Sequence, residues 1–286
     1  MASGSSHNFF SESQFFVGLC AAAMSAETYL VTGSPVNINS ILVIFLAAVF
    51  IYNASRLSLS LNKQDNATRY ILQLEGSSLS ITLCVIALIV LFGLLTMCSV
   101  MQLLVFMGTS LLSLLYMMPF KKNGVRLQGL RNNLVLKNIV LSITWASATV
   151  LFPISHQDFA FPGPEVIFIF LRRFFFIYAL TVIYDMRDLT EDTSAGMKTI
   201  ASIFGDEVTR LWSLASLAMF VLFIFIDPHL ASLQQQVISG ALLLSAVLAA
   251  IIILNTNRKR NKGYYSFVVD GAMTVQFLLV LVARAI

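Results

Sequence analysis

Residues 165–192 read EVIFIFLRRFFFIYALTVIYDMRDLTED, an apolar run that ends in a cluster of acidic residues. A helix needs about 20 apolar residues to cross a hydrocarbon core, so we expect residues 165–184 to span a membrane. If the helix continues, Asp185, Asp188 and Asp192 occupy positions i, i+3 and i+7 on one face. Carboxylates stacked in this way repel one another unless a cation lies between them. The stretch therefore predicts a cation site at a membrane face.

Mg²⁺ is the cation that this spacing favours, because proteins usually hold it with a few carboxylates and the phosphate oxygens of a ligand. We therefore take Asp185, Asp188 and Asp192 as candidate metal ligands and catalytic residues. Arg187 lies off their face of the helix, and we assign it to a structural or lipid-headgroup contact. A solvated polar loop after a membrane helix is the alternative explanation of the whole stretch.

The rest of the chain has the composition of a membrane protein. Of its 286 residues, 58% are hydrophobic and 11% are charged, whereas soluble domains have about 25% charged residues. Apolar runs predict nine transmembrane helices, at about residues 12–32, 38–57, 78–97, 99–118, 134–152, 165–184, 207–226, 234–254 and 264–285. We expect residues 1–286 to form a single all-α polytopic membrane domain.

Basic residues set the orientation of these spans. The loops after spans two, four, six and eight contain Lys and Arg, whereas the loops after spans one, three, five and seven contain neither. Because basic loops stay in the cytoplasm, we expect the N-terminus, the even-numbered loops and the acidic cluster on the cytoplasmic side of a bacterial inner membrane. The net charge of +4 reflects these loops and indicates no nucleic-acid partner.

A short internal similarity divides the chain into two halves. Ile51–Arg56 (IYNASR) closes the second span as Ile183–Asp188 (IYDMRD) closes the sixth. Both spans run inward, so the halves would be pseudo-repeats related by an axis along the membrane normal. The residues of the first half that correspond to the three aspartates are Asn53, Arg56 and Ser60.

With these motifs the chain resembles the UbiA superfamily of intramembrane prenyltransferases over nearly its full length. The resemblance rests on the nine spans, on the acidic cluster followed by Gly196–Ile200 (GMKTI), on Tyr116–Pro119 (YMMP) and on Asp270-Gly271 in the last span. It implies a horseshoe of nine helices around a central cavity with an apolar channel. It also implies Mg²⁺, a prenyl diphosphate whose isoprenyl group is transferred, and a small, typically aromatic, acceptor.

One of the two Asp-rich motifs that the resemblance implies is missing. No Asp or Glu lies between Glu27 and Asp65, and Arg56 and Ser60 stand in place of carboxylates. Arginine brings a positive charge and a planar fork that suits phosphate oxygens. We therefore expect Arg56 to replace one metal ion in binding the diphosphate.

Two further residues join Arg56 as candidate diphosphate ligands. Asn53 keeps the first position of the lost motif, and Lys198 follows the acidic cluster in a cytoplasmic loop. The rival interpretation pairs Arg56 with Asp188 across the cavity and closes an inactive site.

Polar residues inside the spans are costly and normally face a partner or a cavity. We expect Lys137 and Asp270 to pair, with Asn138 in the same network; a place for Asp270 beneath the diphosphate is the alternative. Tyr52 and Tyr184 each precede a motif and are expected to support the site.

Charged residues also lie deeper, toward the outer face. Glu27 and the pair Arg172 and Arg173 have matching depths in the first and sixth spans, and we expect an ion pair between them. A polar patch for a substrate head group is the alternative.

The function that these patterns favour is a Mg²⁺-dependent membrane prenyltransferase. A terpene cyclase, or a transferase with another diphosphate donor, is the alternative within the same class. A transporter and a non-catalytic relative that binds a prenyl lipid are alternatives from other classes. The acidic cluster argues against an anion transporter, since three carboxylates at the cytoplasmic boundary would not help an anion to cross.

Overall fold

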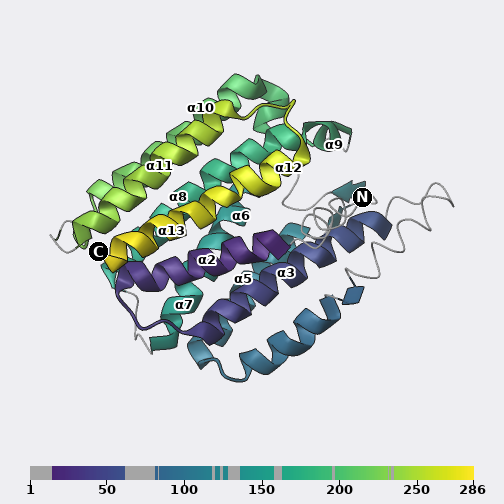
Figure 1. Cartoon of the computed structure of the whole chain (residues 1–286). Helices are drawn as coiled ribbons and strands as arrows, with labels where there is room; N and C mark the ends of the chain where they lie inside the picture. The colour runs from purple at the N-terminus through teal and green to yellow at the C-terminus, as the bar shows by residue number, and fades with distance from the viewer. Residues whose placement is uncertain are drawn as a thin grey trace, which may run out of the picture.

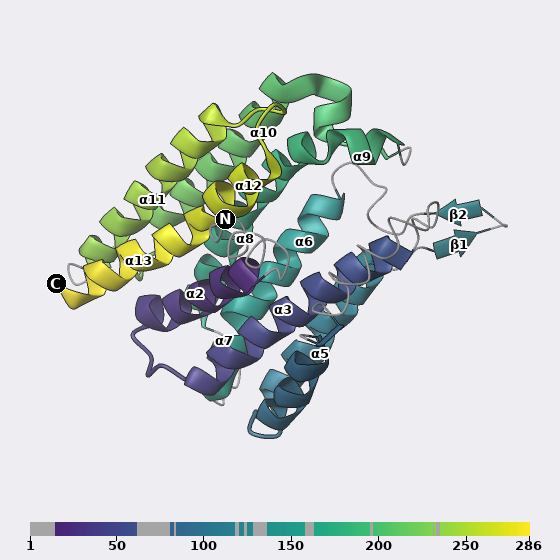
Figure 2. The ribbon, with the colours of Figure 1, turned by 45° about the vertical axis from the view of Figure 1, so that its right-hand side comes forward.

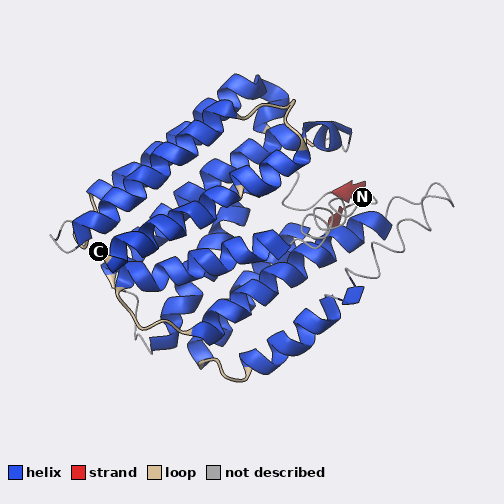
Figure 3. Ribbon diagram, in the orientation of Figure 1, coloured by secondary structure: helices blue, strands red, loops and turns tan. Residues whose placement is uncertain are grey.

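Helices make up most of the described chain (Figure 3). The structure is a computed structural model, and it describes residues 15–61, 81–82, 84–117, 120–122, 125–127, 136–157, 163–194, 197–230, 232 and 235–286. Long apolar helices lie beside one another along a common direction (Figures 1 and 2). A short antiparallel hairpin, in which Phe120 lies opposite Leu127, follows the fourth predicted span.

The first half of the chain contributes four helical segments. They are α2 (Phe15–Thr32), α3 (Ile38–Leu61), the short helix Cys84–Leu95 and α5 (Val100–Met117). The hairpin strands that follow are β1 (Phe120–Lys122) and β2 (Val125–Leu127).

The second half begins with one interrupted helix and continues with longer ones. The interrupted helix is built from α6 (Leu136–Ala146), the π-turn η2 (Ser147–Leu151), α7 (Phe152–Ile154) and the 3₁₀ turn η3 (Ser155–Gln157). The elements that follow are α8 (Pro164–Arg187), α9 (Leu189–Ser194), α10 (Ile200–Phe225) and α11 (Gln236–Asn255). The chain closes with α12 (Lys262–Tyr264), the π-turn η5 (Tyr265–Val269) and α13 (Gly271–Ala285).

The all-α membrane architecture expected from the sequence is confirmed. Within the described residues, six helices are long and apolar enough to cross a membrane, and three shorter apolar helices, Ile38–Ala54, Cys84–Leu95 and Val100–Tyr116, lie where three further spans were expected. The number of nine transmembrane helices and the relation between the two halves stay predictions.

Helix α8 lies at the centre of the packing. It contacts α10 along its length and α6 on another side. Two hydroxyls of α10 donate to backbone carbonyls of α8, Ser213 to Ala179 at 2.6 Å and Ser216 to Phe175 at 2.8 Å. Small hydroxyl residues allow helices to approach closely within a membrane, which explains how α8 and α10 pack together.

A buried ionic network ties α8 to its neighbours at the end of the spans opposite to the acidic cluster. The predicted pairing of Glu27 is confirmed with Arg173, whose Nη2 lies 3.4 Å from Glu27 Oε2. Arg172 pairs instead with Asp227, which follows α10. Gln276 of α13 donates to Glu27 Oε1 at 3.1 Å, so α2, α8, α13 and the end of α10 share one set of contacts.

Candidate functional site

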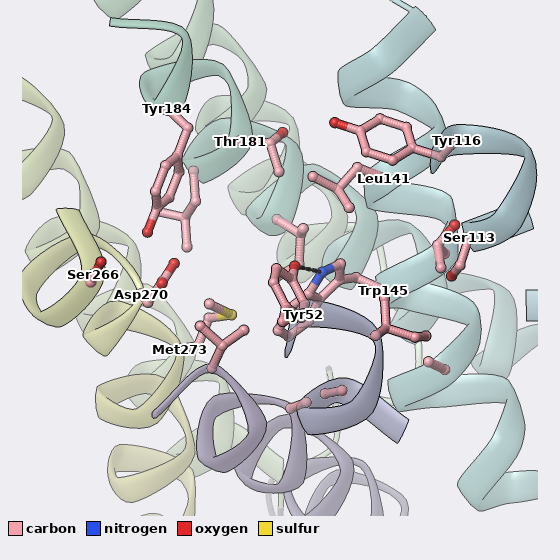
Figure 4. A pocket seen from close by; sticks show the side chains of 18 of the residues that line it. Tyr52, Ser113, Tyr116, Leu141, Trp145, Thr181, Tyr184, Ser266, Asp270 and Met273 are labelled. Carbon is pink, nitrogen blue, oxygen red and sulfur yellow. Dashed lines mark hydrogen bonds between the residues drawn. The ribbon is translucent and has the colours of Figure 1, made fainter. Parts of the chain in front are cut away.

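A central cavity of about 850 Å³ lies among α2, α3, α5, α6, α8 and the segment from α12 to α13. Ligand pockets commonly measure about 300–1,000 Å³, so the cavity can hold a ligand. One end, where α6 and α12 begin and α8 ends, carries charged residues, and the rest is largely apolar and aromatic apart from Asp270 and several hydroxyl groups. Figure 4 shows aromatic and polar side chains of this wall. The charged residues at that end are Lys137, Asp185, Arg187, Asp188 and Lys262.

Lys137 joins two of the predicted metal ligands. Its Nζ lies 2.8 Å from Asp185 Oδ1 and 2.9 Å from Asp192 Oδ2. Asn138 donates from Nδ2 to the other oxygen of Asp185 at 3.2 Å. All four side chains are buried. The first turn of α6 therefore supplies the positive charge that holds Asp185 and Asp192 together.

The helix that should carry all three aspartates is interrupted. Helix α8 ends at Arg187, Asp188 caps it with φ −91° and ψ 3°, and α9 begins at Leu189. Asp185 and Asp192 still converge, but Asp188 has a separate partner. Arg187 donates from Nε to Asp188 Oδ1 at 2.6 Å and from Nη2 to Asp188 Oδ2 at 2.8 Å.

The donor set at the acidic cluster fits one cation. Two carboxylates face one Nζ atom, and Asp192 Oδ1 is buried without a hydrogen-bond partner. The residue pair that could hold a metal ion is therefore Asp185 and Asp192, once Lys137 leaves the position between them. As the side chains lie, no group of three His, Cys, Asp or Glu residues in the described part of the chain has the arrangement of a metal site.

Two of the three predicted diphosphate ligands, Asn53 and Lys198, do not line the cavity. Asn53 is buried, donates to Val49 O at 2.7 Å within its own helix, and is absent from the cavity lining. Lys198 is exposed and is also absent from that lining. The side chains of Arg56 and Ser60 lie outside the described part of the chain.

Two basic residues line the cavity that the sequence did not place there: Arg187 was expected in a structural or lipid-headgroup contact, and Lys262 was not predicted at all. Arg187 lines the cavity and places its guanidinium carbon 4.4 Å from the centre of the Tyr184 ring. Lys262 reaches the same end from α12. The signal that could have found Lys262 is its position at the start of the predicted span that carries Asp270.

Asp270 lies at the cavity wall, apart from Lys137. Its carboxylate faces the Tyr184 hydroxyl (Figure 4), and that hydroxyl donates to Tyr265 O at 2.9 Å. The predicted pairing with Lys137 is replaced by the ion pairs of Lys137 with Asp185 and Asp192.

Tyr52 faces the same space from α3. Its hydroxyl accepts a hydrogen bond from Trp145 Nε1 at 3.1 Å, and the two ring centres lie 6.5 Å apart. The two tyrosines that precede the motifs, Tyr52 and Tyr184, therefore both line the cavity.

Comparison with protein families gives one match. The model of the UbiA prenyltransferase family matches residues 74–278, which is more than half of the chain. No curated protein matches the chain.

Comparison with solved structures shows that the fold is shared. A UbiA homologue from Archaeoglobus fulgidus bound to GPP and Mg²⁺ has a TM-score of 0.62 and 13% sequence identity, over 95% of this chain and 100% of that one. An apo UbiA homologue from Aeropyrum pernix K1 has a TM-score of 0.54 and 16% identity, over 95% and 94%. A structure of digeranylgeranylglyceryl phosphate synthase in membranes has a TM-score of 0.54 and 15% identity, over 96% and 99%.

Proposed function

The chain belongs to the UbiA prenyltransferase family, and from this membership we propose that it binds a prenyl diphosphate in the central cavity and transfers the isoprenyl group to a small acceptor. An aromatic acceptor is the first candidate. The observation that carries the proposal is the polarity of the cavity, which is charged at one end and largely apolar and aromatic elsewhere.

A prenyl diphosphate has the same division into a charged end and an apolar end. The isoprenyl chain gains free energy when apolar side chains replace the water around it. The diphosphate gains from nearby positive groups, which fix its position. Such a ligand therefore has one favoured direction in this cavity, with its phosphates at the end where α8 terminates.

Three basic side chains at that end support the binding of a diphosphate. They are Lys137, Arg187 and Lys262. Arginine offers a fork of donors to phosphate oxygens, and lysine offers a mobile point charge. Arg56 remains in the proposal as a further ligand, because its helix α3 also borders the cavity.

Mg²⁺ is the metal that we propose for the site, held by Asp185 and Asp192 with phosphate oxygens as further ligands. When bound, it would neutralise negative charge on the leaving diphosphate. Lys137 stands where such a cation would be held, between both carboxylates. An arriving diphosphate gives Lys137 an alternative anion, so its ammonium can turn from the carboxylates to the phosphate.

The same arrangement favours a second candidate, a relative that binds a prenyl lipid without reacting. All three aspartates of the cluster already have a basic partner, Asp185 and Asp192 with Lys137 and Asp188 with Arg187. Release of diphosphate from a bound donor separates the two candidates, because only the transferase releases it.

The orientation of the site follows from the charge pattern of the loops. We propose a multi-pass protein of the bacterial inner membrane with the charged end of the cavity at the cytoplasm, where phosphorylated metabolites are available. In this proposal the lipid bilayer surrounds the spans.

Binding of geranyl diphosphate to the purified protein in lipid nanodiscs, with and without Mg²⁺, tests the proposal. Without Mg²⁺, we expect Lys137→Met and Lys262→Met each to weaken binding about tenfold, since each removes one positive charge near the phosphates. Lys259→Met is the matched control, because Lys259 is exposed in the same loop as Lys262 and does not line the central cavity. Absence of binding by geranyl, farnesyl and geranylgeranyl diphosphate under every metal condition would contradict the proposal.

A further inference from the structure

Two serines of α5 differ from the threonines that line the same cavity. Hydroxyls in membrane helices commonly donate to a carbonyl one turn earlier in the helix. Ser110 and Ser113 line the cavity, but within the described part of the chain neither hydroxyl has a hydrogen-bond partner. The threonines of the lining all donate to a carbonyl of their own helical segment; they are Thr109, Thr144, Thr149 and Thr181. The two serine hydroxyls are therefore open to a molecule in the cavity.

The two serines lie next to each other on one face of α5. They are three residues apart, which places their Cβ atoms about 5–6 Å from each other. The usual acceptor of Ser110 would be Phe106 O, and this carbonyl already accepts from Thr109 Oγ1 at 3.0 Å. Each serine hydroxyl can both donate and accept a hydrogen bond. Together they suit an oxygen substituent of a ligand.

The packing of α5 shows which end of the cavity the serines are near. Ser99 Oγ donates to Ser155 O at 3.0 Å, and Gln102 Nε2 donates to Phe152 O at 3.3 Å. The start of α5 therefore lies beside the end of the interrupted helix, and the two run antiparallel. The end of α5 lies beside the start of α6, which carries Lys137.

The same register gives the depth of the serines below the charged end. Ser113 lies at about the level of Leu141, and Ser110 at about the level of Thr144. These levels are four and seven residues after Lys137, about 6 and 10 Å along α6. A diphosphate bound at the charged end would place the first carbons of its isoprenyl group at this depth. The serines are therefore level with the place where an acceptor has to lie.

Aromatic rings are found at this depth as well. Trp145 Nε1 donates to the Tyr52 hydroxyl at 3.1 Å, so each ring holds the other in place. Figure 4 shows Ser113 on α5 and this ring pair on the adjoining walls of the cavity. Aromatic side chains favour a further ring packed against them in an offset or edge-on arrangement. A flat ring between the two walls could thus contact the ring pair and the serine hydroxyls together.

The charge of the lining decides which kind of ring substituent fits. Among the described residues of the lining, the basic ones are Lys137, Arg187 and Lys262, and all three lie at the charged end. A bound diphosphate would engage them there. A carboxylate beside the serines would lose its water without gaining a countercharge, which costs far more than the same loss for a hydroxyl. The depth of the serines therefore favours an uncharged oxygen substituent.

We propose that Ser110 and Ser113 bind the acceptor, and that the acceptor is an aromatic ring with an uncharged oxygen substituent, such as a phenol or a quinol, rather than a ring with a carboxylate. This inference rests on the proposed function, since only a transferase needs an acceptor beside the isoprenyl group. The serines hold the oxygen substituent, and the ring pair of Tyr52 and Trp145 holds the plane of the acceptor ring.

Equilibrium binding of 2-naphthol to the protein in lipid nanodiscs, with binding to empty nanodiscs subtracted, tests the site. In 2-methylnaphthalene a methyl group replaces the hydroxyl, and in 2-naphthoate a carboxylate replaces it. We expect the wild-type protein to bind 2-naphthol about tenfold more tightly than either analogue. The double variant Ser110→Ala/Ser113→Ala should lose the preference for 2-naphthol over 2-methylnaphthalene.

Thr144→Val is the matched control for the double variant. It removes a hydroxyl of the same cavity at the same depth, but this hydroxyl already donates to Val140 O at 2.8 Å. We expect Thr144→Val to keep the wild-type preference for 2-naphthol. The double variant should keep the wild-type melting temperature, because it breaks no hydrogen bond within the described part of the chain.

Three outcomes would overturn the inference. Equal affinity of the wild-type protein for 2-naphthol and 2-methylnaphthalene overturns the site, and so does a preference that survives in the double variant. Tighter binding of 2-naphthoate than of 2-naphthol overturns the assignment of an uncharged acceptor. Binding of geranyl diphosphate to the wild-type protein is measured separately. Its absence counts against the proposed function, while a serine-dependent preference for 2-naphthol still supports a site for an oxygen-bearing ring.

Discussion

At the scale of single residues, Lys137 decides the state of the acidic cluster. Its ammonium group lies within 3 Å of both Asp185 and Asp192. Two carboxylates and one ammonium leave one net negative charge in a buried place, and buried charge is costly unless it is compensated. The cluster therefore favours the binding of a further cation, and the ammonium group of Lys137 competes with that cation for Asp185 and Asp192.

Removal of the Lys137 side-chain charge is predicted to raise the affinity of the acidic cluster for a divalent ion. In Lys137→Met two carboxylates face each other without a cation, so a divalent ion gains more by binding. We expect Mn²⁺ to bind the variant about tenfold more tightly than the wild-type protein in the absence of any diphosphate. Electron paramagnetic resonance of added Mn²⁺ measures the free ion.

The control for this measurement is Lys259→Met, which removes an exposed charge of the same loop region as Lys262 and should bind Mn²⁺ as the wild-type protein does. Equal Mn²⁺ affinity of Lys137→Met and the wild-type protein would show that Lys137 does not compete with a divalent ion for this place.

Local spacing predicts contacts within one segment and misses contacts between segments. Helical periodicity predicted that Asp185 and Asp192 lie together, as they do although the helix is interrupted between them, and matching depth predicted the pairing of Glu27 with Arg173. Lys137 comes from another helix, so its partners depend on how α6 packs against α8. Its pairing with the acidic cluster, in place of Asp270, could not be derived from residue order.

At the scale of elements, turns and kinks account for the differences from the predicted spans. The seventh span was expected from residue 207, and the long part of α10 does follow the kink at Gly205; a short first turn from Ile200 precedes it. A capping box explains the earlier start: Thr199 Oγ1 accepts from the Ser202 N–H at 3.1 Å, and Ser202 Oγ accepts from the Thr199 N–H at 2.8 Å. Hydropathy does not mark where a helix begins, because the cap acts through hydrogen bonds.

The kink that follows this first turn gives an element-scale prediction. Gly205 has φ 78° and ψ 179° within α10, a conformation that is essentially restricted to glycine and costs other residues about 1–3 kcal/mol. An added Cβ would meet no atom within 4 Å, so the penalty in Gly205→Ala comes from the backbone alone. We expect a lower melting temperature in detergent, measured by thermal unfolding.

Gly240→Ala provides the comparison at the same scale. Its Cβ would also meet nothing within 4 Å, and it lies in α11 without a positive φ. We expect this variant to match or exceed the wild-type melting temperature, because alanine favours a helix over glycine by about 1 kcal/mol. A fall of equal size in both variants would contradict the assignment of the cost to the backbone of Gly205.

At the scale of the whole molecule, two buried polar layers lie at opposite ends of the spans. Lys137 and the acidic cluster form one layer, and Glu27, Arg172, Arg173 and Asp227 take part in the other. Exposed apolar side chains cover the outside of the helices, among them Phe225, Leu211 and Leu254. This distribution suits a protein surrounded by lipid, with ionic contacts kept inside.

The orientation of the molecule is open to a direct test. In a variant without Cys20, Cys84 and Cys98, a new cysteine at Lys259 should react with a membrane-impermeant maleimide in inside-out vesicles. A cysteine at His229, in the predicted outer loop, should react in right-side-out vesicles. The reason is that loops rich in Lys and Arg remain in the cytoplasm. The reverse labelling pattern would contradict both the orientation and the cytoplasmic position of the cavity mouth.

The contact between α2 and α13 has a consequence for biogenesis. The two helices lie side by side although they stand far apart in the chain (Figure 1), and Gln276 of α13 bonds to Glu27 of α2. A ribosome that has released α2 must still translate the intervening spans before α13 can reach it. During that interval Glu27 enters the lipid without one of its partners, and the cavity lacks the wall that carries Asp270. The cavity is thus completed only when α13 has been inserted.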